Sequence, residues 1–512
     1  MSPRSAERAQ VLRVLPGLMV VMLLGALDQT IMAPALPAVA GDLGGLDEMP
    51  VVLTAYLVAA TVVMPVFGRL GDRFGRKPVL LGAIGLFMVG AVASGLAGSI
   101  PALVVARVVQ GAGGGGLMIG AQAVLGEVVS PRERGRYLGL LGVVYVLAAV
   151  GGPIVGGLFI DHLSWRWIFA IYPPLGVLAM VAVVRTLRLP VPRDRPSVDY
   201  AGATFLATVV VAVILLAGTL GRPGGPAWLV PVLAVVALAA FAGWLVTARR
   251  AADPVLPLRL FTVRSFAIPT AISFLIGLAL FGTVSYLPAY LQIAMGTSAT
   301  QAGLALTCLM GGVITTMTVS GRLISRTGRY RRYPVIGTAM AAAGMALLAL
   351  VNAATPVPLV LAILLLIGLG IGLTMQVMML VAQNGVDHRD LGAATSTVTF
   401  LRQIGASVGV AVVGALITAR FTERLPDGLA GLLPGSTDAL SPDALAALPP
   451  DLRATVATAF GQAAPPVFGM VAPLLVVAFL LAVALPAQPL RDTAHVGTAD
   501  VGSADVNKGD AP

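Results

Sequence analysis

Two charged side chains lie deep inside long apolar stretches of the sequence. Asp28 lies within residues 20–37, and Arg107 lies within a later apolar run. A charge at the centre of a bilayer costs about 3 kcal/mol or more, so an intramembrane charge is first of all a functional candidate. Asp28 is the one acid of the chain that lies well inside a predicted span, where it could take up and release a proton.

Counting along the chain places Asp28 and Arg107 at the same depth. Each lies about six residues from the outer end of its helix, near Pro34 and Pro101, or about 9 Å at the usual helical rise. Antiparallel helices would bring the two side chains together. Burial and the guanidinium would then act on the carboxyl group in opposite senses, so water entry or substrate approach could change its protonation. The alternative is a static ion pair that only orders two helices.

Composition indicates an integral membrane protein. Of the 512 residues, 57% are hydrophobic and 11% are charged, which excludes a water-soluble globular protein of this length. Apolar runs long enough to cross a hydrocarbon core of about 30 Å recur along the chain, without the alternation of a membrane barrel strand. We therefore expect an all-α integral membrane protein.

Other chemistries lack the residues that they require. The single cysteine, Cys308, excludes an intrachain disulfide, and the three histidines, His162, His388 and His495, fall in predicted loops or in the tail. No metal site is expected, and an enzyme would need several polar groups at one depth. The net charge of +10 comes from arginines in short loops, which indicates membrane topology and not nucleic-acid binding.

Fourteen spans are predicted from the apolar runs between charge clusters and Pro/Gly breaks. They cover residues 14–34, 51–70, 78–98, 102–125, 137–158, 167–186, 200–219, 227–247, 267–289, 302–321, 332–351, 356–381, 394–418 and 467–486. The alternation of arginine-rich and arginine-poor loops places both termini in the cytoplasm, with the chain in the cytoplasmic membrane.

An internal repeat divides the chain into two related halves. Six positions of GRLGDRFGRK, residues 68–77, are matched at a constant offset of 253 in GRLISRTGRY, and each copy follows the second span of a six-span unit. The expected parts are a cytosolic N-terminus (1–13), a six-helix bundle (14–186), two inserted helices with flanking cytosolic loops (187–266), a second six-helix bundle (267–490) with a partly helical outer loop (419–466), and a disordered cytosolic tail (491–512).

An ordered set of motifs resembles the fourteen-helix drug:proton antiporter branch of the major facilitator superfamily. The segments that carry the resemblance are LDQTIMAPALP (27–37), GRLGDRFGRK (68–77), RVVQGAGGGG (107–116), GGPIVGG (151–157), SWRWIF (164–169), YLPAYLQ (286–292) and FLRQIGASVGVAVVG (400–414). The resemblance covers nearly the whole chain. It implies two six-helix bundles with two inserted helices and transport by alternating access.

In the first cytosolic loop the resemblance implies a latch that holds the outward-facing state. Glycines allow a tight turn there, and Asp72 can form charge-assisted bonds with a nearby arginine or with a helix N-terminus. In the second copy Ser325 replaces Asp72, so only one half should carry the full latch. Ordinary positive-inside residues would explain the arginines but not Asp72. The expected gate residues are Gly68, Asp72, Arg73, Gly75, Arg76 and Glu127.

Small residues around Pro153 form the antiporter-like motif. They permit close helix packing, and a proline removes a helix hydrogen bond and permits bending. The resemblance implies a seal against proton leakage, formed by Gly151, Gly152, Pro153, Gly156 and Gly157. The glycine-rich run 111–116 formally contains GxGxxG, but it lies in an apolar helix with no preceding strand, so we reject a nucleotide site.

The carboxyl-terminal half lacks an equivalent of Asp28. The repeat offset leads to Phe281, and this half holds no acid at membrane depth and one base, Arg402. We therefore expect it to supply the apolar wall of a substrate pocket, although packing or lipid contact is an alternative for each residue. The candidates are Phe274, Phe281, Tyr286, Tyr290, Met310, Met375 and Met378.

These observations lead to an expected function. The resemblance implies an antiporter that exports drugs, antibiotics or other amphipathic small molecules, and we expect it to act as a monomer. Its energy source would be the proton gradient, with no cofactor, and its partners would be substrate, protons and the lipid bilayer. The alternative is a dedicated exporter of a single natural product, amino acid or lipid on the same fold.

Overall fold

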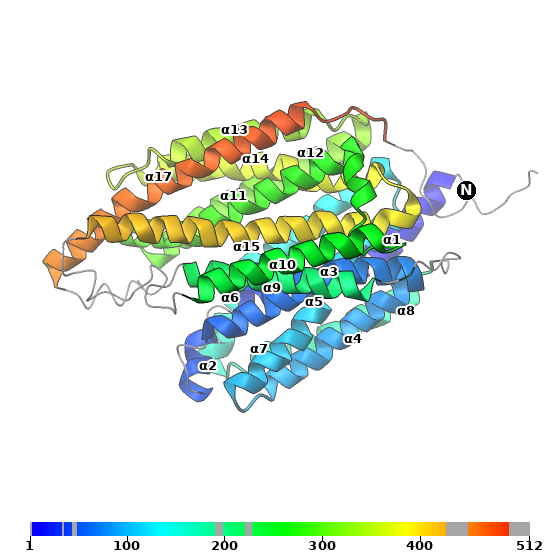
Figure 1. The fold of residues 1–512 in the computed structure, drawn as a ribbon, viewed down its shortest axis with the longest axis horizontal. Helices are drawn as coiled ribbons and strands as arrows, with labels where there is room; N and C mark the ends of the chain where they lie inside the picture. Colours follow the sequence, from blue (N-terminus) through cyan, green and yellow to red (C-terminus); the bar gives the residue numbers. More distant parts are fainter. Residues whose placement is uncertain are drawn as a thin grey trace, which may run out of the picture.

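The structure is a computed structural model that describes residues 3–32, 35–43, 49–189, 197, 199–220, 228–425 and 449–490. In these residues the regular structure is helical (Figure 1). The helices are α1 (Pro3–Ile31), α2 (Leu36–Leu43), α3 (Met49–Phe74), α4 (Arg76–Gly95), α5 (Ile100–Val128), α6 (Pro131–His162), α7 (Trp167–Ala170), α8 (Tyr172–Thr186), α9 (Tyr200–Leu220), α10 (Leu229–Arg250), η3 (Leu258–Thr262), α11 (Arg264–Ala294), α12 (Ala299–Thr327), α13 (Arg332–Leu348), α14 (Val357–Asn384), η4 (His388–Asp390), α15 (Leu391–Arg424) and α17 (Pro450–Val483).

Each stretch predicted as a span overlaps a helix of the described residues, with α7 and α8 together lying within 167–186. Within the described residues, 11 helices are long and apolar enough to cross a membrane, and α9 contains a shorter apolar helix over Tyr200–Leu216. The chain is therefore a multi-pass membrane protein.

Several helices are longer than the apolar runs that predicted them. The predicted outer loop 419–466 is shortened from both ends, because α15 continues to Arg424 and α17 begins at Pro450. The helices continue past the apolar runs because polar residues at their ends still form backbone hydrogen bonds. The predicted tail 491–512 lies outside the described residues.

Two helical bundles form the body of the protein (Figure 1). In the amino-terminal bundle α5 packs against α3 and α4, and α1 packs against α6 and α8. In the carboxyl-terminal bundle α11 packs against α15 and α17, and α14 packs against α12 and α13. The bundles meet where α3 packs on α15 and where α6 packs on α12, while the α9–α10 pair lies against α3 and α15.

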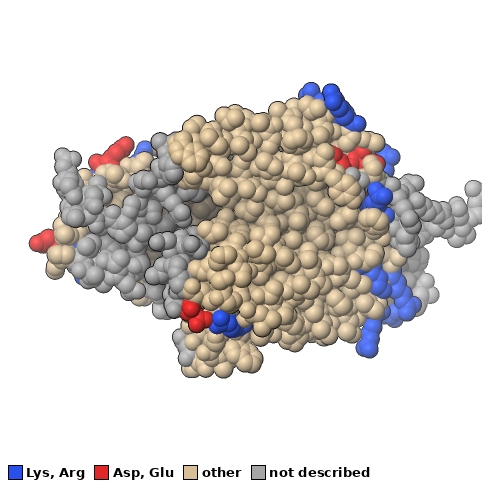
Figure 2. All heavy atoms as spheres, turned by 60° about the horizontal axis from the view of Figure 1, so that its bottom comes forward, with Lys and Arg blue, Asp and Glu red and all other residues tan. Residues whose placement is uncertain are grey.

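On the face shown in Figure 2, most of the basic side chains lie at one end of the bundles. We call it the basic end, and it includes the α3–α4 turn, the start of α6, the α12–α13 connection and the end of α17. The α3–α4 turn depends on Gly75, whose φ of 92° is unfavourable for residues with a side chain. At the α12–α13 connection, Gly328 ends α12 with a φ of 67° in the left-handed conformation.

Glycines allow α5 to approach its neighbours closely, and this approach sets the position of Arg107. A Cβ at Gly113 would lie 2.3 Å from the backbone nitrogen of Phe87 on α4, and a Cβ at Gly111 would lie 2.4 Å from the backbone oxygen of Tyr56 on α3. The glycine-rich run therefore packs helices, as small residues commonly do in membrane proteins.

This packing predicts that Gly113→Ala destabilises the protein. The added methyl group meets backbone atoms that cannot rotate away, so α4 and α5 must separate, at a cost of about 1–3 kcal/mol. We expect a lower thermal unfolding midpoint of the detergent-purified protein, followed by tryptophan fluorescence.

The matched control is Gly85→Ala on α4, where a Cβ would meet nothing within 4 Å. Equal unfolding midpoints for the two variants would contradict the assigned role of Gly113.

Candidate functional site

Asp28 on α1 and Arg107 on α5 are in direct contact in the interior of the amino-terminal bundle. Arg107 Nη1 donates hydrogen bonds to Asp28 Oδ1 at 2.9 Å and to Oδ2 at 2.8 Å. Each residue is 1% exposed. The two opposite charges therefore compensate each other away from water, which buried charges require.

Gln110 completes this cluster, although it was not among the residues predicted from the sequence. Its Nε2 donates to Asp28 Oδ1 at 2.9 Å, while its Oε1 accepts from Arg107 Nη1 at 2.9 Å and from Ser94 Oγ at 3.2 Å. Gln110 follows Arg107 by three residues, so the two side chains share one helix face. That spacing could have indicated the residue, since its amide can bond to both members of the ion pair.

Aromatic rings enclose the guanidinium of Arg107. Its central carbon lies 4.4 Å from the centroid of the Tyr56 ring and 5.9 Å from that of Phe169. Rings at these distances attract a cation. However, Arg107 Nε is buried and has no hydrogen-bond partner among the described residues, and one nitrogen makes all the bonds to Asp28. The pair therefore lacks the two-nitrogen geometry that gives the strongest Arg–carboxylate interaction.

Residues next to Asp28 connect α1 to α6. Tyr145 donates to Gln29 Oε1 at 3.1 Å, and Thr30 Oγ1 donates to the Ala148 carbonyl at 2.9 Å. A Cβ at Gly152 would lie 2.1 Å from Thr30 Oγ1, so this glycine of the predicted antiporter motif lies directly against α1. Gly151 and Gly157 have open space beside them.

Gly156 is buried on α6, and the Pro153 side chain lies outside the described residues. Within the motif, it is therefore Gly152 that brings α6 close to α1 beside Asp28.

A second charged cluster joins the two bundles at the basic end. Arg76 Nε donates to Glu127 Oε2 at 3.1 Å, and Arg76 Nη2 is paired with Asp72. Asp72 in turn accepts from the backbone nitrogens of Gly392 at 3.2 Å and Ala393 at 3.1 Å. These nitrogens lie in the first turn of α15, where free N–H groups and the helix dipole favour a negative charge.

Close backbone contact accompanies the cluster. A Cβ at Gly68 would lie 2.8 Å from the Gly392 carbonyl oxygen, and one at Gly392 would lie 2.6 Å from the Gly68 carbonyl oxygen. Both positions therefore require glycine for α3 and α15 to meet. Arg73 is half-buried and stacks over the Phe74 ring at 5.2 Å.

Asp390, immediately before α15, extends this network to the segment that follows α10. It contacts Arg259 Nη2 at 2.7 Å and Arg69 Nη1 at 3.8 Å, and Arg69 Nε donates to the Pro254 carbonyl at 3.0 Å. Asp390 was not among the residues predicted from the sequence, because Arg259 and Arg69 are distant from it in the chain.

The second copy of the repeat makes a different contact at the pseudo-equivalent place. A Cβ at Gly321 on α12 would lie 2.4 Å from the Gly135 carbonyl oxygen on α6. Where Ser325 replaces the acid, its backbone carbonyl accepts from Arg132 Nε at 3.2 Å. Both inter-bundle contacts thus have a glycine crossing, and within the described residues it is the α3–α15 contact that has an acid capping a helix.

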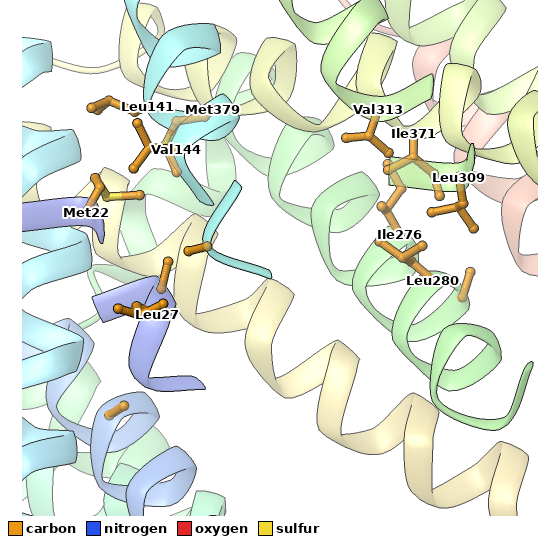
Figure 3. Packing of buried hydrophobic residues seen from close by; sticks show 14 of the residues in the cluster. Met22, Leu27, Leu141, Val144, Ile276, Leu280, Leu309, Val313, Ile371 and Met379 are labelled. Carbon is orange, nitrogen blue, oxygen red and sulfur yellow. The ribbon is translucent and has the colours of Figure 1, made fainter. Parts of the chain in front are cut away.

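Apolar residues continue the joint between the bundles toward the interior. Met379 of α14 lies beside Leu141 and Val144 of α6 (Figure 3). Ile276, Leu280, Leu309, Val313 and Ile371 pack together within the carboxyl-terminal bundle (Figure 3).

The predicted pocket residues fall into two groups. Tyr290 and Met378 are fully buried, and Tyr290 donates to the Val351 carbonyl at 3.3 Å and packs edge-on against Phe468. These two residues belong to the core of the carboxyl-terminal bundle. The sequence alone could not separate core residues from pocket residues here, because the inward and outward faces of a helix that is apolar all round look alike. The half-buried residues are Phe274, Phe281, Tyr286, Met310 and Met375.

The fold and the two charge clusters define an integral membrane protein built from two helical bundles that meet at the basic end. A family model for the Major Facilitator Superfamily matches residues 18–410. The chain therefore belongs to the Major Facilitator Superfamily, a family of transporters and not of enzymes.

Several relatives have names that describe transport. An uncharacterised MFS-type transporter of Mycobacterium tuberculosis is 38% identical over 81% of this chain, and the match spans 60% of that relative's length. The multidrug transporter protein MdtP of Bacillus subtilis is 31% identical over 82% of this chain and 78% of its own length. An acurin A biosynthesis cluster MFS-type transporter of Aspergillus aculeatus is 31% identical over 77% of this chain and 73% of its own.

Solved structures support the fold. The human organic anion transporter MFSD10 has a TM-score of 0.62 and 17% identity, covering 94% of this chain and 100% of its own. The proton:xylose symporter XylE has a TM-score of 0.60 and 15% identity, covering 94% of this chain and 98% of its own. At these identities the likeness concerns the arrangement of helices.

The Asp72 cluster generates a prediction about the contact between the bundles. Asp72→Asn removes the charge that faces both Arg76 and the first turn of α15. Breaking a buried ion pair costs about 3 kcal/mol, enough to change a two-state ratio more than about a hundredfold. We expect a new, longer-distance population between spin labels at Glu133→Cys and Thr327→Cys, in a Cys308→Ser background, measured by pulsed electron paramagnetic resonance.

The control variant is Asp387→Asn, which changes an exposed acid at the same end. The assignment fails if Asp72→Asn and Asp387→Asn give the same distance distribution as the parent protein.

Proposed function

We propose that the protein is a proton-coupled antiporter that exports drugs, antibiotics or other amphipathic small molecules across the cytoplasmic membrane. The observation that carries this proposal is the buried Asp28, held by Arg107 and Gln110 inside the amino-terminal bundle. The basic end would face the cytoplasm, as the positive-inside rule favours. All fourteen predicted spans would cross the bilayer, with both termini in the cytoplasm.

Proton binding at Asp28 would change the forces within the cluster. A proton on Oδ1 or Oδ2 removes the negative charge that attracts Arg107, which itself stays protonated. Arg107 then lacks its compensating charge, while Gln110 can still bond to the neutral acid. The pair's single-nitrogen geometry and the unpartnered Nε support a releasable interaction over a purely structural one.

Movement of α1 would connect this change to the gate. Asp28 and Thr30 lie on the same helix, and Thr30 contacts α6 at Ala148 and Gly152. The start of α6 in turn contacts α12 through Gly135, at the joint between the bundles. A shift of α1 after protonation would therefore act on one of the two places where the bundles meet.

The Asp72 cluster would hold the basic end closed while the opposite side is open. Opening toward the cytoplasm requires Asp72 to leave the first turn of α15, which exposes a buried charge and free N–H groups. In this cycle the proton enters from outside, binds Asp28 as substrate leaves, and departs to the cytoplasm when the basic end opens. The proton gradient supplies the energy, and no cofactor is needed.

The relatives' names support an amphipathic cargo, since MdtP is named a multidrug transporter. A dedicated exporter of one natural product is the second candidate. It is favoured by the acurin A cluster relative, whose name ties it to a biosynthetic cluster. A panel of unrelated dyes and antibiotics separates the two, because a dedicated exporter should move none or one of them.

Asp28→Asn tests the proton site directly. The substitution preserves size but cannot exchange a proton, so substrate-driven proton movement should fall to the level of empty vesicles. The measurement is the response of a pH-sensitive dye in proteoliposomes when ethidium, an amphipathic cation, is added.

Two further variants keep this test interpretable. Asp28→Glu retains a titratable carboxyl group and should retain part of the coupling, whereas Asp42→Asn makes the same chemical change at an exposed position on α2 and should leave coupling intact. Coupling that persists in a correctly folded Asp28→Asn protein would overturn the proposal.

A further inference from the structure

A cavity of about 670 Å³ lies at the basic end of the carboxyl-terminal bundle. Its walls come from the α12–α13 connection, the first turns of α13, the last residue of α17 and the segment that follows α17. Three arginines line it, together with Tyr330, Val483 and Gln488; the arginines are Arg329, Arg331 and Arg332. No part of this cavity belongs to the Asp28 or Asp72 clusters.

Among the described residues, no carboxylate balances the positive charge of the cavity. No acid lines the cavity, and none of its three arginines forms a salt bridge within the described residues. By contrast, Arg69, Arg76 and Arg259 at the same end each face a carboxylate. The N-terminus of α13 at Arg332 adds a positive helix end. This arrangement favours an anion with several acceptor oxygens.

Hydrogen bonds hold the cavity walls in place without a ligand. Tyr330 is 3% exposed, and its hydroxyl donates to the Pro486 carbonyl at 2.6 Å and accepts from the Gln488 nitrogen at 2.9 Å. Burial raises the pKa of Tyr330, so this hydroxyl stays neutral and continues to donate. Arg331 also donates to the Val483 carbonyl at the end of α17. The two sides of the cavity are therefore connected to each other.

One side of the cavity is apolar and faces outward. Ile336 is 51% exposed and Val483 is 42% exposed, and both line the cavity next to the arginines. Exposed aliphatic side chains near the end of a membrane-spanning helix are suited to acyl chains. A soluble phosphate would use the arginines but not this surface, whereas a phospholipid would use both. Basic pockets of this kind bind anionic head groups.

We propose that this cavity binds the phosphate head group of an anionic phospholipid, with its acyl chains along α13 and α17. The lipid would bridge the α12–α13 connection to the end of α17 and stabilise the basic end of the carboxyl-terminal bundle. This inference rests on the membrane location of the chain and not on proton coupling, so the two proposals can fail separately.

The experiment uses the full chain, purified in detergent, with phosphatidylglycerol as the probe. Native mass spectrometry counts bound lipid, and thermal unfolding reports stabilisation. We expect phosphatidylglycerol to bind and to raise the unfolding midpoint, while phosphatidylcholine does not. Arg329→Gln combined with Arg332→Gln should weaken phosphatidylglycerol binding about thirtyfold.

A matched double variant controls for net charge. Arg249→Gln with Arg250→Gln removes two exposed charges from the end of α10 and should bind phosphatidylglycerol like the parent protein. Equal weakening by both double variants would show nonspecific attraction and overturn the proposed site. The proposal is also overturned if phosphatidylglycerol fails to bind, or if inorganic phosphate at millimolar concentration displaces the lipid and stabilises the protein equally.

The acids that follow the cavity in the sequence provide a competing occupant. Beyond Leu490 the chain contains Asp492, Asp500, Asp505 and Asp510, which lie outside the described residues. We expect the full-length variant with these four changed to Asn to retain the lipid-dependent stabilisation. The contrary outcome has two parts. The parent protein binds no lipid, and the four-Asn variant has an unfolding midpoint as low as that of the Arg329→Gln, Arg332→Gln variant. In that case the chain's own acids fill the cavity and the lipid assignment is wrong.

Discussion

A buried charge must be compensated, and this constraint organises the membrane interior of the protein. Asp28 and Arg107 can lie away from water only because each is the other's counter-charge. Their contact requires α1 and α5 to keep a fixed position relative to each other along the helix axes. The glycines of α5 make this possible, since Gly111 and Gly113 allow α5 to approach α3 and α4 at backbone distance. Packing and charge compensation thus support the same arrangement of helices.

The same constraint explains why the two bundles are joined asymmetrically. At the α3–α15 crossing, Asp72 satisfies both a guanidinium and the free N–H groups of a helix from the other bundle. At the α6–α12 crossing, Arg132 donates to the backbone carbonyls of Ser325 and Arg326 on α12. When the helices separate, the hydrogen bonds between Asp72 and the first turn of α15 break together, whereas carbonyls at the surface can exchange their protein partner for water. The first crossing is therefore the better place for a gate with two distinct states.

Some of these contacts could be predicted from the sequence, and others could not, for identifiable physical reasons. Asp28 and Arg107 could be paired because helical rise converts residue counts into depth. The partner of Asp72 in the other bundle could not be located, because Gly392 is 320 residues away and backbone N–H groups carry no sequence signal. Asp390 was overlooked for the same reason. Tyr290 and Met378 pack in the core, which is the alternative that the sequence left open for every pocket candidate, because apolar residue type does not specify which helix face is inward.

The sequence alone determined that the chain is a helical membrane protein with two related halves and one deep acid. Hydrophobic run length, loop charge and the repeat are local properties, and they do not depend on how helices pack. Tertiary structure decided which groups complete each charge cluster, namely Gln110 beside Asp28 and the first turn of α15 beside Asp72. It also decided that three neighbouring arginines line a cavity with the end of α17. Such contacts depend on helix rotation and approach, which distant parts of the chain set together.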